Sequence, residues 1–187
     1  MRQGLLGGTF DPIHLGHLVL GEAAREQLRL DSVLFVPAGT QWRKAGREIA
    51  PAQHRVAMVE LAVAGNAAFE VSTVEVERPG PSYMADTLEE LSETPDVELF
   101  LVLGKDAYED LPNWVRPDRI RELATLAVAA RNGEDVTLEE PAVRVETPEI
   151  GISATDIRER VAAGRSIRYL VPEAVEAYIR EHGLYLG

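Results

Sequence analysis

The chain has 187 residues, 45% of them apolar, and a formal net charge of −12. This length allows one sizeable hydrophobic core, and the absence of cysteine excludes disulfides, thiolate zinc sites and cysteine nucleophiles. The acidic balance argues against long nucleic acid as a partner, because such binding needs a continuous basic face. We see neither a leader pattern nor a membrane-spanning apolar run, so we expect a cytoplasmic protein that binds no membrane. The sequence is compatible with an oligomer.

Short apolar runs alternate with helical patterns along the first 130 residues. The apolar runs are RQGLL (2–6), SVLFVP (32–37), FEVSTVEV (69–76), VELFLVL (97–103) and LATLAVAA (123–130). The helical patterns between them cover residues 17–28, 51–64, 82–91 and 116–123, and Ser82 is a candidate N-cap of the third. This alternation predicts βαβ units and a Rossmann-like, doubly wound α/β fold with a parallel sheet.

The pattern changes after residue 131. Residues 133–148 are acidic and contain proline, so we expect a partly exposed loop or an edge strand there. Two further helical patterns, at 154–163 and 172–182, predict a small C-terminal helical subdomain. We therefore expect a nucleotide-binding domain over residues 1–150 and a subdomain over residues 151–187 that completes its site.

The segment GGTFDPIHLGH, residues 7–17, follows the first predicted strand and concentrates groups suited to bind phosphate. Glycines at this turn let backbone amides approach an anion closely, and the helix that follows directs its positive end to the same place. His14 and His17, three residues apart, add two donors that can face one bound group. A phosphate site is therefore the preferred interpretation of this segment.

Two other interpretations of the histidines stay open. Both side chains could cap or pack the first helix without binding a ligand. A metal site is also conceivable with Asp11 as third ligand, but the HExxH pattern of zinc hydrolases is missing and no cysteine is available. The phosphate interpretation needs no additional ligand, so we expect no metal ligand among the protein residues.

Five segments carry a resemblance to a known family. GTFDPIHLGH (8–17) and ISATDIR (152–158) resemble the HxGH nucleotidyltransferase superfamily. GPSYMADT (80–87), LGKDAYEDLPNW (103–114) and the terminal LVPEAVEAYIREHGLY (170–185) are similar to segments of the bacterial nicotinate-nucleotide adenylyltransferase family, in the same order. The resemblance implies transfer of AMP from ATP to nicotinate mononucleotide, with Mg²⁺, giving nicotinate adenine dinucleotide and pyrophosphate in NAD biosynthesis.

The resemblance also implies roles for individual residues. Those matching the ATP site are Gly7, Gly8, Thr9, Phe10, His14, His17, Gly104, Asp106, Ser153, Thr155 and Arg158. Those assigned to the mononucleotide are Asp11, Lys44, Tyr83, Met84 and Trp114. The residues expected to act in catalysis are His14, His17, Lys44 and Arg158.

Three positions depart from the family pattern. Met84 stands where many relatives have Thr, which removes a hydroxyl from the segment expected to meet the pyridine carboxylate. Trp42-Arg43-Lys44 replaces a Pro-His-Lys loop but keeps the cation at Lys44. Arg131-Asn132-Gly133 replaces Arg-Pro-Gly. Two purely structural interpretations also stay open: Ser153 is a good helix N-cap in its own right, and Trp114 could be an ordinary core residue.

The chemistry itself fits the residues. The attacking phosphate of a mononucleotide is largely dianionic at neutral pH, because its second pKa is about 6, so no general base is required. Alternative functions are another HxGH transferase, such as a phosphopantetheine adenylyltransferase or a glycerol-phosphate cytidylyltransferase, a nucleotide-binding module without turnover, and a zinc hydrolase. The SYxxDT-like and LPxW segments favour the pyridine nucleotide.

Overall fold

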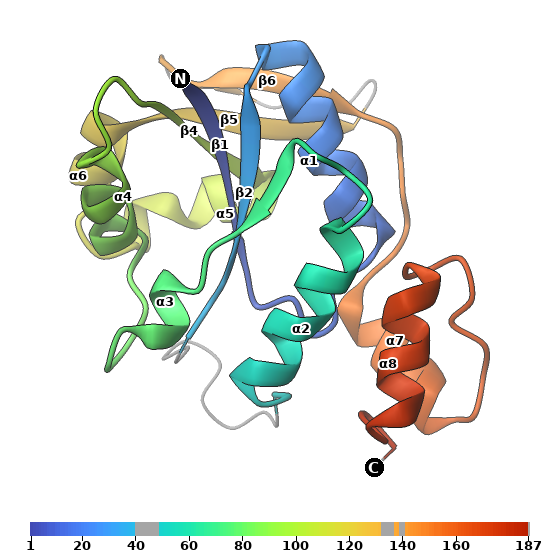
Figure 1. Ribbon diagram of the computed structural model, residues 1–187. Coiled ribbons are helices and arrows are strands. Elements are labelled where there is room, and N and C mark those ends of the chain that lie inside the picture. The colour runs from blue at the N-terminus through green and yellow to red at the C-terminus, as the bar shows by residue number, and fades with distance from the viewer. Residues whose placement is uncertain (40–48, 132–136, 139–140, 187) are drawn as a thin grey trace.

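A computed structural model describes residues 1–39, 49–131, 137–138 and 141–186. Within these residues the strands form one six-stranded parallel sheet in the order β3-β2-β1-β4-β5-β6 (Figure 1). The strands are β1 (Arg2–Gly8), β2 (Ser32–Pro37), β3 (Phe69–Val71), β4 (Glu98–Gly104), β5 (Ala124–Arg131) and β6 (Val143–Thr147). The order reverses between β1 and β4, which confirms the predicted Rossmann-like, doubly wound α/β fold.

The apolar runs of the sequence become the central strands. Every residue of β2 is buried, as are residues 99–103 of β4. Strands covered on both faces need apolar side chains at successive positions, which is why these runs do not alternate with polar residues. The edge strands β3 and β6 carry exposed residues, and β6 confirms the edge strand expected within residues 133–148.

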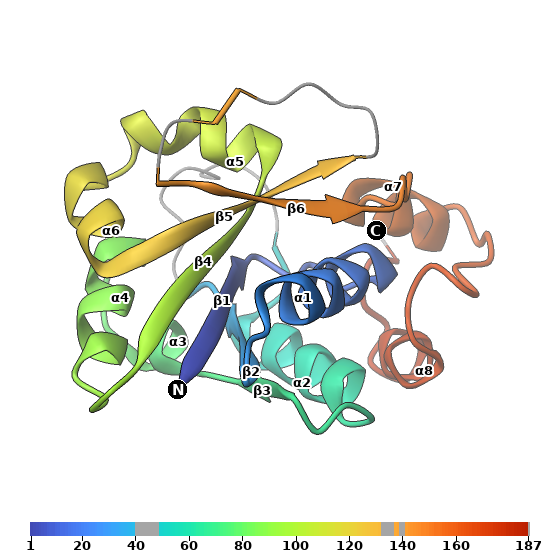
Figure 2. The ribbon, with the colours of Figure 1, turned by 90° about the horizontal axis from the view of Figure 1, so that it is seen from above.

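Helices cover both faces of the sheet, as the view from above shows (Figure 2). One face carries α1 (Leu15–Leu28) and α2 (Ala52–Val63), whose apolar residues join the first core cluster. The other face carries α4 (Met84–Ser92), α5 (Lys105–Asp110), the 3₁₀ turn η2 (Leu111–Asn113) and α6 (Pro117–Leu123), and these pack into a second cluster. The short α3 (Val74–Glu77) follows β3.

The C-terminal helices α7 (Ala154–Ala162) and α8 (Glu173–Glu181) pack on the α1 and α2 side. Ile157 of α7 and Ile179 of α8 belong to the first core cluster, and the Leu15 amide donates to the Leu170 carbonyl over 3.0 Å. The predicted C-terminal helical subdomain is thus present, and its first helix begins beside the β1–α1 turn. The division at residue 150 stays a prediction. None of the helices in the described ranges is long and apolar enough to cross a membrane.

Two local predictions are wrong. The run FEVSTVEV is strand only to Val71, and its second half is the helix α3. Ser82 does not cap α4, because Tyr83 occupies the N-cap position and the Ser82 hydroxyl accepts a hydrogen bond from the Gly39 amide, 3.0 Å away. The pairing of β3 with β2 ends at Val71, and the Ser82 hydroxyl is used by the backbone that follows β2.

Gly39 lies at this junction, where the backbone after β2 passes α3. A Cβ at Gly39 would stand 2.1 Å from the Glu75 carbonyl oxygen, closer than packed atoms can come. Glycine is therefore required here by close approach of two backbones, and the approach brings the end of β2 next to the start of α4.

We predict that Gly39→Ala lowers the free energy of unfolding by about 2 kcal/mol or more, because the backbone of α3 must move. Urea unfolding gives the measurement, and Gly65→Ala is the matched control, since a Cβ at Gly65 meets nothing within 4 Å. Equal stability of the two variants would contradict the clash.

Candidate active site

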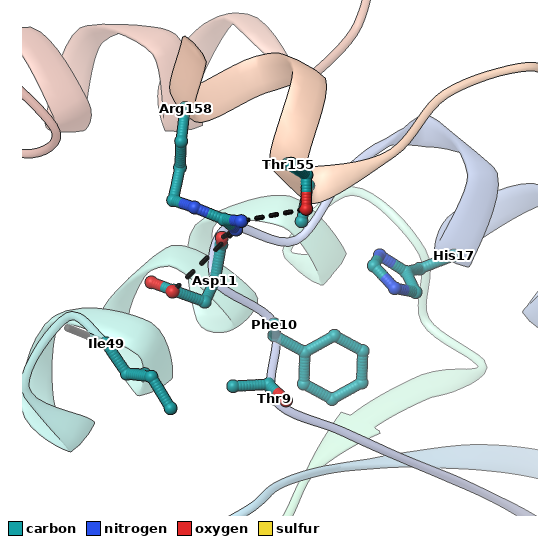
Figure 3. Close-up of a pocket in the computed structure, with 8 residues that line it drawn as sticks. Thr9, Phe10, Asp11, His17, Ile49, Thr155 and Arg158 are labelled. Carbon is teal, nitrogen blue, oxygen red and sulfur yellow. Dashed lines mark hydrogen bonds and ion pairs between the residues drawn. The ribbon is translucent and has the colours of Figure 1, made fainter. Parts of the chain in front are cut away.

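A cavity of about 210 Å³ opens at the carboxyl end of β1 (Figure 3). Its walls come from the β1–α1 turn, the first turn of α1, the segment that leads into α2, and the start of α7. The lining residues are Thr9, Phe10, Asp11, His17, Ile49, Ala154, Thr155 and Arg158. Six of these were predicted from the sequence as site residues, from segments up to 149 positions apart.

Two helices direct their N-termini at this cavity. His17 lies in the first turn of α1, and Ala154 and Thr155 open α7. Ser153 is the N-cap of α7 and its hydroxyl accepts from the Asp156 amide over 3.1 Å, so the capping interpretation of Ser153 is confirmed. The amides at the start of a helix have no acceptor within the helix, and together with the helix dipole they favour a bound anion.

His14 and His17 stack on each other, with ring centroids 3.7 Å apart. The His14 backbone N–H donates to Nδ1 of His17 over 3.2 Å, so the neutral His17 ring carries its hydrogen on Nε2. The Phe10 ring meets His17 edge-on at 5.0 Å. His17 reaches the cavity as a fixed neutral donor, whereas His14 is buried behind it and does not line the cavity.

Burial keeps both imidazoles uncharged. Desolvation lowers the pKa of His14 from 6.5 to about 4, and Nδ1 of that ring meets no hydrogen-bond partner in the described part of the chain. The pKa of His17 is lowered well below 6.5, first by desolvation and then by the neighbouring His14. A charge on one ring would cost more beside the other, so the pair offers hydrogen-bond donation rather than positive charge.

Among the described residues that line the cavity, Arg158 supplies the positive charge. Its Nη1 donates to the Asp11 carbonyl over 2.5 Å and lies 3.8 Å from Oδ2 of Asp11, and its Nη2 donates to the Thr155 hydroxyl over 2.9 Å. Figure 3 shows the guanidinium between these two residues. Asp11 is only 3% exposed, so its carboxylate mainly contacts the surrounding protein and presents little surface to the cavity.

A second group of predicted residues gathers on the other face of the sheet. The paired residues Leu5 and Leu101 align β1 with β4, so both strands end at the same edge, where Gly104 is exposed and a Cβ there would meet nothing within 4 Å. Asp106 is exposed in the first turn of α5. Met84 opens α4 with Tyr83 as N-cap, and its Cε lies 2.6 Å from where a Cβ on Gly7 would be.

The double glycine lies in the strand β1 and not in the turn after it, where the sequence predicted it. Gly7 and Gly8 belong to the strand, and the turn begins at Thr9. Gly7 leaves room for the end of the Met84 side chain, and a Cβ on Gly8 would press on the Phe10 ring at 3.0 Å. These glycines allow α4 and the turn to approach β1, which places the two groups of site residues on either side of one strand end.

Trp114 stands just after η2 and is half-buried. Its indole N–H donates to Asp110 over 3.1 Å, and its ring packs against the second core cluster. Arg116 pairs with Asp86 of α4, which ties the Trp114 loop to the helix opened by Met84. The core and ligand interpretations of Trp114 both stay open in this geometry.

Some predictions fall on residues outside the described ranges. Lys44, together with Trp42 and Arg43, lies there, as do Asn132 and Gly133. Lys44 therefore keeps its predicted role without a structural account. Among the described residues, no group of three or more His, Asp or Glu side chains could hold a metal ion.

Besides Ile49 and Ala154 of the cavity lining, two residues that contact the turn after β1 were not predicted from the sequence. Arg55, 3% exposed on α2, donates to the carbonyls of Ala50 and Thr9 over 3.0 and 2.8 Å, and Tyr185 donates to Asp11 over 2.8 Å. A buried arginine in a helix and a tyrosine near the C-terminus give no signal by spacing. The only available hint was the similarity of the terminal segment to the family.

The fold and the cavity define a Rossmann-like protein in which the N-terminal turns of two helices border a cavity at the carboxyl end of β1. Residues 5–160 match the cytidylyltransferase-like family model. Curated relatives extend the match to nearly the whole chain. A protein of Thermomicrobium roseum is 51% identical over 98% of this chain and 91% of its own length, and one of Thermus thermophilus is 51% identical over 99% of this chain and 100% of its own length. Both bear the name "Probable nicotinate-nucleotide adenylyltransferase".

Solved structures share the fold at lower identity. The Plasmodium falciparum nicotinic acid mononucleotide adenylyltransferase complexed with NaAD superposes with a TM-score of 0.80 at 17% identity, over 98% of this chain and 97% of its own. The same enzyme complexed with APC gives a TM-score of 0.77 over 98% and 96%. On the strength of the relatives near 50% identity, the chain belongs to the nicotinate-nucleotide adenylyltransferase family.

We predict a pH-dependent loss of stability that depends on His14. The unfolded chain binds a proton at His14 near pH 6.5 but the folded protein only near pH 4, so the unfolded state holds more protons between these values. The free energy of unfolding therefore falls as pH decreases through this window, by about 2 kcal/mol from this one group at about pH 5.

Urea unfolding of wild type and His14→Gln at about pH 7.5 and about pH 5 measures this contribution. The pH-dependent loss is expected to shrink by about 2 kcal/mol in His14→Gln and to stay unchanged in His182→Gln, which alters an exposed histidine. Equal pH dependence in all three proteins would contradict the neutral buried ring.

Proposed function

We infer that the chain transfers AMP from ATP to nicotinate mononucleotide and releases pyrophosphate. One observation carries this conclusion: in a chain of this family, two helix N-termini, the neutral His17 ring and the Arg158 guanidinium border one cavity at the end of β1. These are groups that bind phosphate and stabilise charge, and the reaction needs little else. The family supplies the identity of the two substrates.

The chemistry requires two polyanions to be held in line. The phosphate of the mononucleotide attacks the α-phosphorus of ATP, and the bond to pyrophosphate breaks. His17 Nε2–H is suited to donate to the α-phosphate as its charge is redistributed, and Arg158 is suited to the departing pyrophosphate. Because both imidazoles are neutral, they need not lose or gain a proton during the step.

This proposal divides the site between two substrates, and ATP contacts residues of both groups. The cavity of α1 and α7 takes the phosphates of ATP, with Gly104 and Asp106 toward the ribose. The α4 side takes the mononucleotide, where the first amides of the helix, at Met84 and Ala85, have no acceptor within the helix and suit a carboxylate. Trp114 would stack on the pyridine ring. Lys44 stays a proposed catalytic cation, and cytoplasmic localisation stays a prediction.

The proposed Mg²⁺ belongs with ATP rather than with the protein. Asp11 is the one carboxylate among the described residues that line the cavity, and it is engaged with Ala50, Tyr185 and Arg158. The residues described around the cavity therefore provide no set of metal ligands. Mg²⁺ often binds through substrate phosphates and water, and it would neutralise charge on the triphosphate.

Pyrophosphate release from MgATP tests the proposal, with nicotinate mononucleotide, nicotinamide mononucleotide, phosphopantetheine and glycerol phosphate as parallel acceptors. We expect pyrophosphate release with the two pyridine mononucleotides and none with phosphopantetheine or glycerol phosphate. Release only with phosphopantetheine or glycerol phosphate would move the chain to another transferase activity. ATP binding without any release would identify a binding module.

We predict that kcat/KM favours nicotinate over nicotinamide mononucleotide by at least about tenfold, or roughly 1.4 kcal/mol. Amides directed at a carboxylate form charge-assisted hydrogen bonds, whereas a carboxamide must present an NH₂ to them. Paired kinetics on both mononucleotides give the ratio. Met84→Thr should raise it by adding a hydroxyl to the same turn. Equal use of both mononucleotides would refute carboxylate recognition at α4.

We predict that His17→Asn lowers kcat by about 100-fold or more, because one donor to the developing charge is lost. Asn keeps an acceptor near the position of Nδ1 for the His14 N–H but has nothing at Nε2. His17→Gln places an amide near Nε2 instead, and should retain more activity than His17→Asn. Steady-state kinetics on folded variants decide the matter, and a near-normal kcat in His17→Asn would remove His17 from the proposed mechanism.

A further inference from the structure

Asp11 lies where four separate parts of the chain meet. It follows β1 and is 3% exposed, and its Oδ1 accepts from the Ala50 amide over 3.2 Å and from the Tyr185 hydroxyl over 2.8 Å. Its carbonyl and Oδ2 face Arg158. A carboxylate this deeply buried is retained only where donors surround it, so each donor helps to fix its orientation.

Tyr185 reaches Asp11 through an unusual backbone path. After α8, Gly183 adopts φ 60 and the Leu184 amide donates to the Ile179 carbonyl over 3.0 Å, which turns the chain back toward the core. Tyr185 then adopts φ 65, in the left-handed region that a tyrosine rarely occupies. Residues held in that region cost free energy, and the surrounding structure must maintain them. Here the result is that a side chain 174 positions away touches Asp11.

Arg158 depends on Asp11 for its position in the cavity. The contact of 2.5 Å to the Asp11 carbonyl and that of 2.9 Å to the Thr155 hydroxyl fix two of its nitrogens, and the Asp11 carboxylate balances its charge at 3.8 Å. A rotation of the Asp11 side chain would move its carboxylate relative to Nη1 of Arg158, although the backbone carbonyl would stay in place. The guanidinium would then point differently toward a bound anion.

We propose that Tyr185 is a positioning residue: through its hydrogen bond to Asp11 it sets the orientation of Arg158 toward the pyrophosphate that leaves ATP. The proposal rests on the function inferred above and adds a residue from the C-terminal segment to the site. The contribution belongs to the hydroxyl, because the ring also packs against the first core cluster and a Phe would keep that packing.

Tyr185→Phe is the test, and Tyr178→Phe is its matched control. Tyr178 lies on α8, its hydroxyl is 3.0 Å from Nδ1 of His54, and neither residue lines the cavity. We expect Tyr185→Phe to lower kcat by about tenfold and to weaken inhibition by pyrophosphate similarly, with the KM for the mononucleotide unchanged. Tyr178→Phe should leave all three values as in wild type.

A double-mutant cycle separates positioning from a general structural effect. If Tyr185 acts through Arg158, Tyr185→Phe should cause no further loss of kcat in an Arg158→Gln background. An equal loss in both backgrounds, a loss shared by Tyr178→Phe, or a kcat loss that follows a drop in the urea midpoint would overturn the proposal.

The inferred function is tested separately by the wild-type protein. If wild type releases no pyrophosphate from ATP with any mononucleotide, the function fails. The positioning role of Tyr185 is then tested by calorimetry with pyrophosphate alone. Tyr185→Phe should bind pyrophosphate about tenfold more weakly than wild type and Tyr178→Phe do. Equal pyrophosphate affinities of Tyr185→Phe and wild type would overturn the positioning role in either case.

Discussion

The pairing of β1 with β4 is the constraint on which the rest of the structure depends. All strands are parallel, so their carboxyl ends meet at one edge, and the order reverses between these two strands. The helix directly after β1, α1, packs on one face, and the helix directly after β4, α5, packs on the other. The loops therefore separate at this point and leave room for a ligand that neither half could enclose alone.

In the proposed function, an acidic chain binds polyanions because the donors are local. The cavity relies on helix amides, one guanidinium and a neutral imidazole, rather than on an excess of basic residues. Burial of the histidine pair removes charge that would vary with pH, and it fixes a donor of defined tautomer. The single carboxylate at the cavity is held by its neighbours, so it opposes a bound phosphate less than a free carboxylate would.

Close approach of backbones assembles the site from distant segments. Because Gly7 has no side chain, the end of the Met84 side chain fits beside it. Because Gly39 has none, the backbone after β2 comes close to α3, and α4 begins beside the end of β1. The C-terminal segment closes the other side, where α7 supplies Arg158 and the residues after α8 supply Tyr185. Residues from both the first and the last segments of the chain therefore meet beside this cavity.

The sequence by itself determined the fold class and six of the eight residues that line the cavity. Apolar runs such as 32–37 are typical of strands buried on both faces, as in a parallel sheet covered by helices. The double glycine and the paired histidines indicated phosphate chemistry through local spacing, whereas the ISATDIR segment indicated it through the resemblance to the family. Tertiary structure alone decided that residues 74–77 are helical, that Ser82 bonds to Gly39 and does not cap α4, and that His14 lies behind His17. It also brought Arg55 and Tyr185 to the turn after β1. These features depend on contacts between residues far apart in the chain, and no local pattern encodes which distant partner a hydroxyl or a guanidinium will meet.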